Sequence, residues 1–227
     1  MGRIAIHCAE RYLELTAWQV EEISLRMEEE GRDFEARYKE MLVVLLMGTP
    51  SKANQRRVRQ LLGEVPLAEL LPHASFKIFD VNLRPPHYQL AYLRDMMQQA
   101  DFIKLNDDEL YELSAAFGSP YHSLEQNLRY LAGHTDTAHI CITLGQHGAV
   151  YFRHGKILAH HGFRVSMADS VGAGDSFLAG FLFQMLSGAS PEDTLAFACA
   201  IGALNVTRHG AVPDISLAEI QALMHPE

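Results

Sequence analysis

The stretch from Asp169 to Phe177 carries the residue types that could do chemistry. It reads Asp-Ser-Val-Gly-Ala-Gly-Asp-Ser-Phe, and the segment from Leu178 to Leu182 continues it as a mainly apolar run. Small residues at 172–174 leave the backbone free to turn, and the run predicts a helix that begins there. The N–H groups at a helix N-terminus form an anion site, to which the helix dipole adds partial positive charge. The same field would keep the carboxylate of Asp175 ionised.

Two other glycine-loop interpretations are excluded. A dinucleotide-binding loop needs a third glycine where this sequence has Phe177, and the Gly-Lys-Ser/Thr of a Walker loop is missing. A simpler alternative stays open, in which Asp175 only caps a helix after a tight turn.

The residue order in this segment resembles the C-terminal signature of the ribokinase-like (PfkB) carbohydrate kinases. Both have an acid, a Ser or Thr, one further residue, Gly-Ala-Gly-Asp and a Phe two positions on. The resemblance implies that Gly172, Ala173 and Gly174 form an anion hole for the transferred phosphoryl group. It also implies that Asp175 is the catalytic base, which takes the proton of the attacking sugar hydroxyl. Both roles suit phosphoryl transfer, which depends on positioning and charge stabilisation.

A second segment resembles the Asn-x-x-Glu motif of that family. Asn106 and Glu109 stand three residues apart at the start of an expected helix, so they share one face of it. Both offer oxygen ligands that suit Mg²⁺, and the resemblance implies that they bind ATP and Mg²⁺ through water and phosphate. A helix N-cap with an acid at the third position explains the pair equally well.

Further ATP-binding residues follow from the same resemblance. Thr143, Gly145 and Gly148 lie in a segment similar to the strand and turn that run along ATP, although an ordinary hairpin is the alternative. Cys199 lies in a stretch similar to the helix beside the adenine, where many relatives have Asn. The loop after that helix, with backbone oxygens of Asp169 and Ser170, is expected to hold a monovalent cation such as K⁺.

The expected substrate residues are Asp80, Asn82 and Arg84. They end a predicted strand, where α/β proteins place ligand groups, and they resemble the Asp-x-Asn-x-Arg segment of the fructokinase-like branch. The planar guanidinium of Arg84 suits an oxyanion of substrate or phosphate, and a structural salt bridge is the competing interpretation.

The elements that must position these residues alternate along the chain from Met41 onward. Alternation of strands with helices predicts a mostly parallel α/β sheet flanked by helices, with a hairpin near its edge. Residues 1–227 are expected to form one domain, with an atypical helical region at 1–40 and a nucleotide-binding and catalytic body at 41–227. Strands are expected at 41–47, 76–81, 102–105, 139–144, 149–153 and 156–165, and helices at 54–62, 89–99, 107–117, 124–132, 174–186, 191–208 and 216–224.

The composition limits which partners and which cellular compartment are expected. The chain has 19 Lys and Arg against 28 Asp and Glu, a net charge of −9, which argues against nucleic acid or an anionic membrane as partner. Its longest apolar run, Met41–Met47, has seven residues, whereas a membrane span needs about 20. Three widely spaced cysteines indicate reduced thiols and a cytoplasmic protein.

The resemblance also implies segments that this sequence does not show. Family members begin with a strand, a glycine-rich segment that contacts the sugar, and strands that form a lid, yet no Gly-Gly pair occurs here. The expected fold is therefore ribokinase-like, with the N-terminal part and the lid truncated. Three functions stay open: an ATP-dependent, fructokinase-like sugar kinase, a nucleotide-binding relative with little catalysis, and an interaction protein that reuses the fold. A homodimer is a further expectation, because exposed sheet edges invite pairing.

Overall fold

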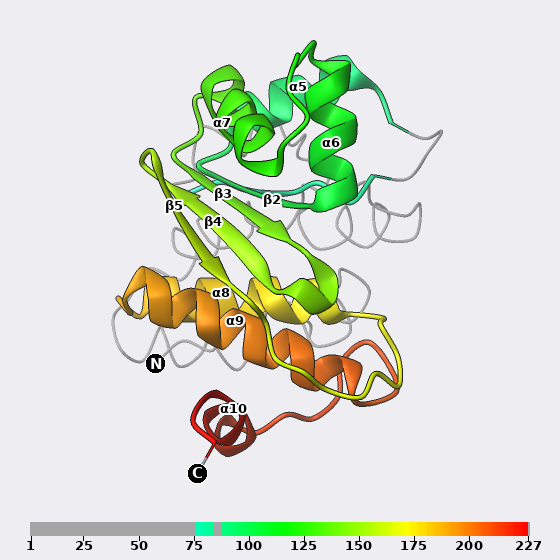
Figure 1. Ribbon diagram of the computed structural model, residues 1–227, viewed down its shortest axis with the longest axis vertical. Coiled ribbons are helices and arrows are strands. Elements are labelled where there is room, and N and C mark those ends of the chain that lie inside the picture. Colours follow the sequence, from blue (N-terminus) through cyan, green and yellow to red (C-terminus); the bar gives the residue numbers. More distant parts are fainter. Residues whose placement is uncertain (1–75, 84–87, 227) are drawn as a thin grey trace, which may run out of the picture.

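The computed structural model describes residues 76–83 and 88–226, and every structural statement below refers to them (Figure 1). The elements expected at 41–47 and 54–62, the helical region at 1–40 and the side chain of Arg84 lie outside the described residues. No helix in the described part is long and apolar enough to cross a membrane.

The described strands form one mixed sheet whose spatial order follows the chain. The first three strands run parallel and the last two are antiparallel to their neighbours. The predicted α/β class with a hairpin at the edge is confirmed. The strands are β1 (Ile78–Asp80), β2 (Phe102–Asn106), β3 (His139–Thr143), β4 (Ala149–Arg153) and β5 (Lys156–His160).

The last strand is shorter than the sequence predicts. It ends at His160 instead of continuing to residue 165. Gly162 has a φ of 73°, and its N–H donates to Nδ1 of His160 at 3.1 Å. The chain therefore turns out of the extended conformation two residues after the strand.

Helices cover both faces of the sheet (Figure 1). Alternate residues of a strand face opposite ways, so Ile103 and Leu105 join the core under the first group of helices, whereas Phe102 joins the core under the second. Burial on both faces explains why the parallel strands read as continuous apolar runs. The first group is α5 (Leu90–Gln99), α6 (Asp107–Ala116) and α7 (Leu124–Thr135), and the second is α8 (Ala173–Leu186) and α9 (Pro191–Val206).

The two helices of the second group pack closely against each other. A Cβ on Gly180 of α8 would lie only 2.6 Å from Cγ2 of Ile201 in α9, so the two helices approach through a glycine. The short helix α10 (Leu217–Met224) then packs on α9 through Ile220. This packing places the predicted anion loop, at the start of α8, beside the loop that follows α9.

Candidate active site

The glycine loop is shaped by the backbone of a distant segment. Gly172 is the N-cap of α8, with a φ of 81°. A Cβ at this position would lie 2.0 Å from the carbonyl oxygen of Ala211, which is a severe steric clash. Glycine is therefore required both by the left-handed backbone and by the close approach. The loop leads directly into the first turn of α8, where the N–H of Ala173 donates to the carbonyl of Ser170 at 3.4 Å. The partial positive charge at this helix N-terminus favours an anion.

The carboxylate of Asp169 ties this loop to the segment after α9. Its Oδ1 accepts the N–H of Val171 at 3.0 Å, and its Oδ2 accepts the N–H of Gly210 at 3.1 Å. These hydrogen bonds, the first from Val171 and the second from Gly210, hold the pKa of Asp169 below its ordinary value. The side chain of Asp169 is thus used in joining two loops, and a monovalent cation would have to use backbone oxygens of Asp169 and Ser170.

Asn205 makes a second tie that the sequence did not reveal. It is fully buried near the end of α9, and its Nδ2 donates to Oγ of Ser176 at 2.9 Å and to the carbonyl of Ala211 at 3.2 Å. Ser176 follows the expected base Asp175 directly in the first turns of α8. The available signal was a single Asn within the otherwise apolar stretch of residues 195–206.

Asn106 and Glu109 form the capping box at the start of α6. Oδ1 of Asn106 accepts the N–H of Glu109 at 2.8 Å, and Oε2 of Glu109 accepts the N–H of Asn106 at 2.9 Å. Oε1 of Glu109 also accepts the N–H of Leu83 at 2.8 Å, beyond the end of β1. The capping alternative that the sequence left open is therefore realised in the structure.

Capping and metal binding are compatible at this pair. Each carboxylate oxygen of Glu109 accepts one backbone hydrogen bond, which leaves further lone-pair sites for a water of Mg²⁺. Among the described residues, no three His, Cys, Asp or Glu side chains gather into a metal site. A Mg²⁺ ion near Asn106 and Glu109 would accordingly depend on phosphate oxygens and water, its usual ligands in phosphoryl-transfer sites.

The expected substrate residues Asp80 and Asn82 lie where β1 ends. Asn82 is a non-glycine residue with a φ of 45°, a backbone conformation that is uncommon outside glycine. The residue on each side is held by a hydrogen bond: Val81 donates its N–H to the carbonyl of Lys104 at 3.1 Å, and Leu83 donates to Glu109. The turn that presents Asn82 is thus fixed by β2 and by the capping box of α6.

A buried lysine stands among these acids. Nζ of Lys104, in β2, pairs with Oδ1 of Asp80 at 2.9 Å, and its side chain is 6% exposed. Burial is the largest single effect on its pKa and lowers it, but the negative charges of Asp80, Glu109 and Asp175 together outweigh burial and raise the pKa of Lys104. The structure therefore brings the expected base, the capping carboxylate and one expected substrate residue around a single ammonium group.

The remaining expected ATP residues divide into two groups. Thr143 pairs in register with Asn106 across β3 and β2, so it lies at the same edge of the sheet as the capping box. Gly145 and Gly148 form the turn from β3 to β4, and a Cβ on Gly148 would lie 1.9 Å from the carbonyl oxygen of His160. Gly148 is therefore required for packing of the turn against the end of β5.

Cys199 does not join the site. It is 7% exposed and packs in the core between α9 and the sheet, together with Cys141 and Tyr151. Burial raises the pKa of Cys199 to about 12, so the side chain is a neutral thiol in apolar surroundings. The helix turns this side chain towards the sheet, and its binding to the adenine stays a prediction.

Comparison with known proteins identifies relatives of this chain. The family model described as pfkB family carbohydrate kinase matches residues 64–217, well over half of the chain. A fructokinase of Escherichia coli is 32% identical over 152 residues, which cover 62% of this chain and 48% of that protein. The chain spans about half the length of the curated relatives it matches.

Solved structures show the same fold. A ribokinase of Thermotoga maritima matches with a TM-score of 0.62 at 20% identity, covering 84% of this chain and 59% of that one. A fructokinase of Xylella fastidiosa with bound ATP matches with a TM-score of 0.59 at 25% identity, covering 73% of this chain and 59% of that one. The expected ribokinase-like fold is confirmed.

Proposed function

The chain belongs to the pfkB family of carbohydrate kinases, and we propose that it transfers the γ-phosphoryl group of ATP to a hydroxyl of a sugar. The observation that carries this proposal is the turn at Gly172, held against Ala211, which opens the first turn of α8 to an anion beside Asp175. The known fructokinases among the relatives make fructose the first sugar to test.

In this proposal each part of the site has one role. Asp175 takes the proton of the attacking hydroxyl as the new oxygen–phosphorus bond forms and the bond from the γ-phosphorus to the bridging oxygen breaks, which releases ADP. Gly172, Ala173 and Gly174 offer backbone N–H groups to the negative charge of the transferred group. Asn106 and Glu109 would hold a Mg²⁺ ion through water, and the ion would supply positive charge against the nucleotide phosphates.

The neighbouring loops would hold the nucleotide and the sugar. The turn 143–148 would lie along ATP, and its place at the edge of the sheet that carries Asn106 supports this role. Asp80 and Asn82, with Arg84, would contact the sugar. Backbone oxygens of Asp169 and Ser170 would lie near K⁺, so nucleotide affinity should rise in K⁺ relative to Na⁺ or Li⁺ of the same concentration.

One observation favours a second candidate. Because the chain spans about half the length of its curated relatives, a protein of these residues could bind nucleotide and yet phosphorylate little. Tight binding of ATP–Mg²⁺ by calorimetry, with no sugar-dependent release of ADP, would favour this second candidate.

The test of the proposed base is Asp175→Asn. Without the carboxylate, kcat for sugar-dependent ADP release should fall by about 10²–10⁴-fold, while the affinity for ATP–Mg²⁺ changes little. The matched control is Asp193→Asn, which removes an exposed acid from the first turn of α9 in the same way and should leave kcat unchanged. Wild-type turnover by Asp175→Asn would refute the assigned base.

A further inference from the structure

Lys104 is the one charged residue in the buried strand segment Phe102–Leu105, and the roles proposed above make no use of it. The whole residue is 5% exposed. A buried ammonium costs free energy unless it is paired, so its presence in an apolar strand requires an explanation.

The ion pair with Asp80 is part of that explanation. Nζ lies 2.9 Å from Oδ1 of Asp80, whose side chain is 15% exposed, and the pair joins two neighbouring parallel strands. A pair of this kind could be purely structural, with the lysine neutralising one carboxylate.

A second contact points beyond that role. A Cβ added to Gly174 would lie 3.2 Å from Nζ and 3.7 Å from Cε of Lys104. The ammonium is therefore packed directly on Gly174, the last residue of the glycine loop, one residue before Asp175. Its charge also acts on Asp175 and Glu109, which come from two other elements of the site.

We propose that Lys104 is a positioning residue for phosphoryl transfer, a fixed positive charge packed behind the anion loop at Gly174. It acts through that loop, since it holds the Gly174 backbone in place and adds a full charge to the partial charges of the N–H groups. The charge is most useful when negative charge on the transferred group is greatest. This inference rests on the proposed function, because it names a further residue of the same site.

A double-substitution cycle separates this role from neutralisation of Asp80. The four proteins are wild type, Lys104→Met, Asp80→Asn and the double variant. In the Asp80→Asn background the carboxylate of Asp80 no longer needs neutralising, so a lysine whose only role is that ion pair can be removed there without effect. Lys156→Met, which removes an exposed lysine from β5, controls for the loss of one positive charge.

The readout is the affinity for ADP–Mg²⁺ with fluoroaluminate, which mimics the phosphoryl group in transfer, compared with the affinity for ADP–Mg²⁺ alone. The double variant should bind the fluoroaluminate complex at least about tenfold more weakly than Asp80→Asn, with ADP–Mg²⁺ affinity changed much less. Equal fluoroaluminate affinity of these two proteins overturns the role of Lys104 and leaves the proposed function standing.

Two further results complete the test. If the double variant does not fold, Asp80→Asn with Lys104→Gln replaces the ion pair by two amides and takes its place. If wild type binds neither ADP–Mg²⁺ nor the fluoroaluminate complex, the proposed function itself fails and the role of Lys104 fails with it.

Discussion

At the scale of single residues, Gly172 shows how one missing side chain sets the geometry of the site. Replacing it by Ala puts a Cβ 2.0 Å from the carbonyl of Ala211 and forces an L-residue into a φ of 81°. The backbone cost alone is about 1–2 kcal/mol, and the clash must also push the 207–212 loop away. We expect Gly172→Ala to lower the thermal midpoint and to abolish measurable ATP–Mg²⁺ binding by calorimetry.

Gly188 offers a control with the same backbone and no clash. Its φ is 79°, yet nothing lies within 4 Å of an added Cβ. Gly188→Ala should therefore lose the backbone contribution only and keep nucleotide affinity. If both variants bind nucleotide equally well, the contact between Gly172 and Ala211 does not shape the site.

Some features of single residues can be predicted from the sequence, and others cannot. The start of α8 after Gly172 and the capping box of Asn106 and Glu109 depend on neighbours within a few residues, so local patterns predict both. Lys104 depends on Asp80, 24 residues away, and Asn205 on Ser176, 29 residues away. A sequence states neither contact, because both arise only when strands and helices pack.

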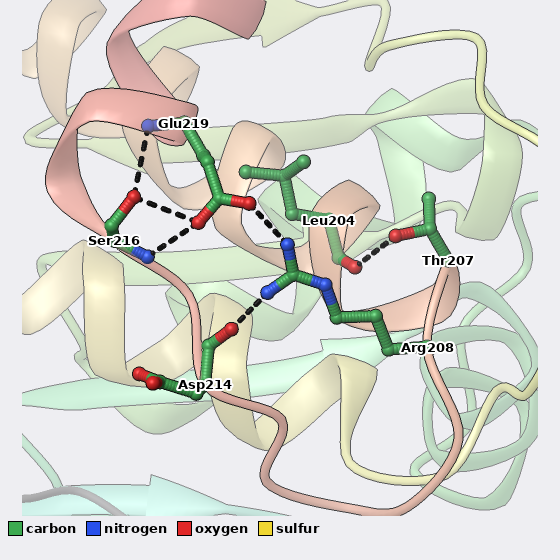
Figure 2. A network of polar contacts seen from close by, with 6 residues as sticks. All are labelled: Leu204, Thr207, Arg208, Asp214, Ser216 and Glu219. Carbon is green, nitrogen blue, oxygen red and sulfur yellow. Dashed lines mark hydrogen bonds and ion pairs between the residues drawn. The ribbon is translucent and has the colours of Figure 1, made fainter.

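At the scale of elements, α10 is fastened to the loop after α9 by one ion-pair network (Figure 2). Arg208 donates to the carbonyl of Asp214 and pairs with Glu219, whose Oε2 also accepts the N–H and the hydroxyl of Ser216 at 2.8 and 2.7 Å. These bonds, first those from Ser216 and then that from Arg208, lower the pKa of Glu219 to about 2. The network therefore closes the segment that carries Gly210 and Ala211.

This network should make stability depend on acid pH. A carboxyl whose pKa is lower in the folded state stabilises that state above its ordinary pKa, near 4.5, and the stabilisation is lost as pH falls towards 2. We expect Glu219→Gln to have a lower urea midpoint than wild type at pH 7. The difference in midpoint between the two proteins should shrink as pH falls from about 4.5 to 2. A difference that persists unchanged at pH 2 would contradict the assignment.

Glu125→Gln is the matched control. Glu125 pairs with Arg129 one turn along α7 at 2.9 Å, but its side chain is 61% exposed against 43% for Glu219, and it forms no capping box. Exposed pairs of this kind contribute about 0.3–0.5 kcal/mol, so its effect at pH 7 should be the smaller one.

At the scale of the whole molecule, the order of elements could be predicted but their arrangement only in part. Apolar runs of strand length separated by helical patterns gave the α/β class, since the parallel strands are buried on both faces. The end of β5 was predicted wrongly, because the residue pattern at 156–165 suits a strand and does not reveal the turn that Gly162 and His160 form. Contact between the two loops at Gly172 and Ala211 joins segments far apart in the chain, and local patterns carry no sign of it.

Two cysteines buried on the α8–α9 side of the sheet allow a test of whether the core unfolds cooperatively. Cys141 in β3 and Cys199 in α9 are 0% and 7% exposed in the same core cluster, and burial raises the pKa of both thiols. Thiol reagents attack the thiolate, so neither sulfur should react until the core opens. With Cys8→Ser removing the third thiol, we expect both to react with one common rate, at least about 1000-fold slower than a free thiol.

That common rate should rise with urea along the same curve as global unfolding followed by circular dichroism. Both thiols lie between the sheet and α9, so they become accessible together when these two elements separate. Ile201→Ala, which removes apolar contact at the close approach of α8 and α9, should speed both reactions equally. Two distinct rates would contradict a single cooperative core and would show that α9 detaches before the sheet unfolds.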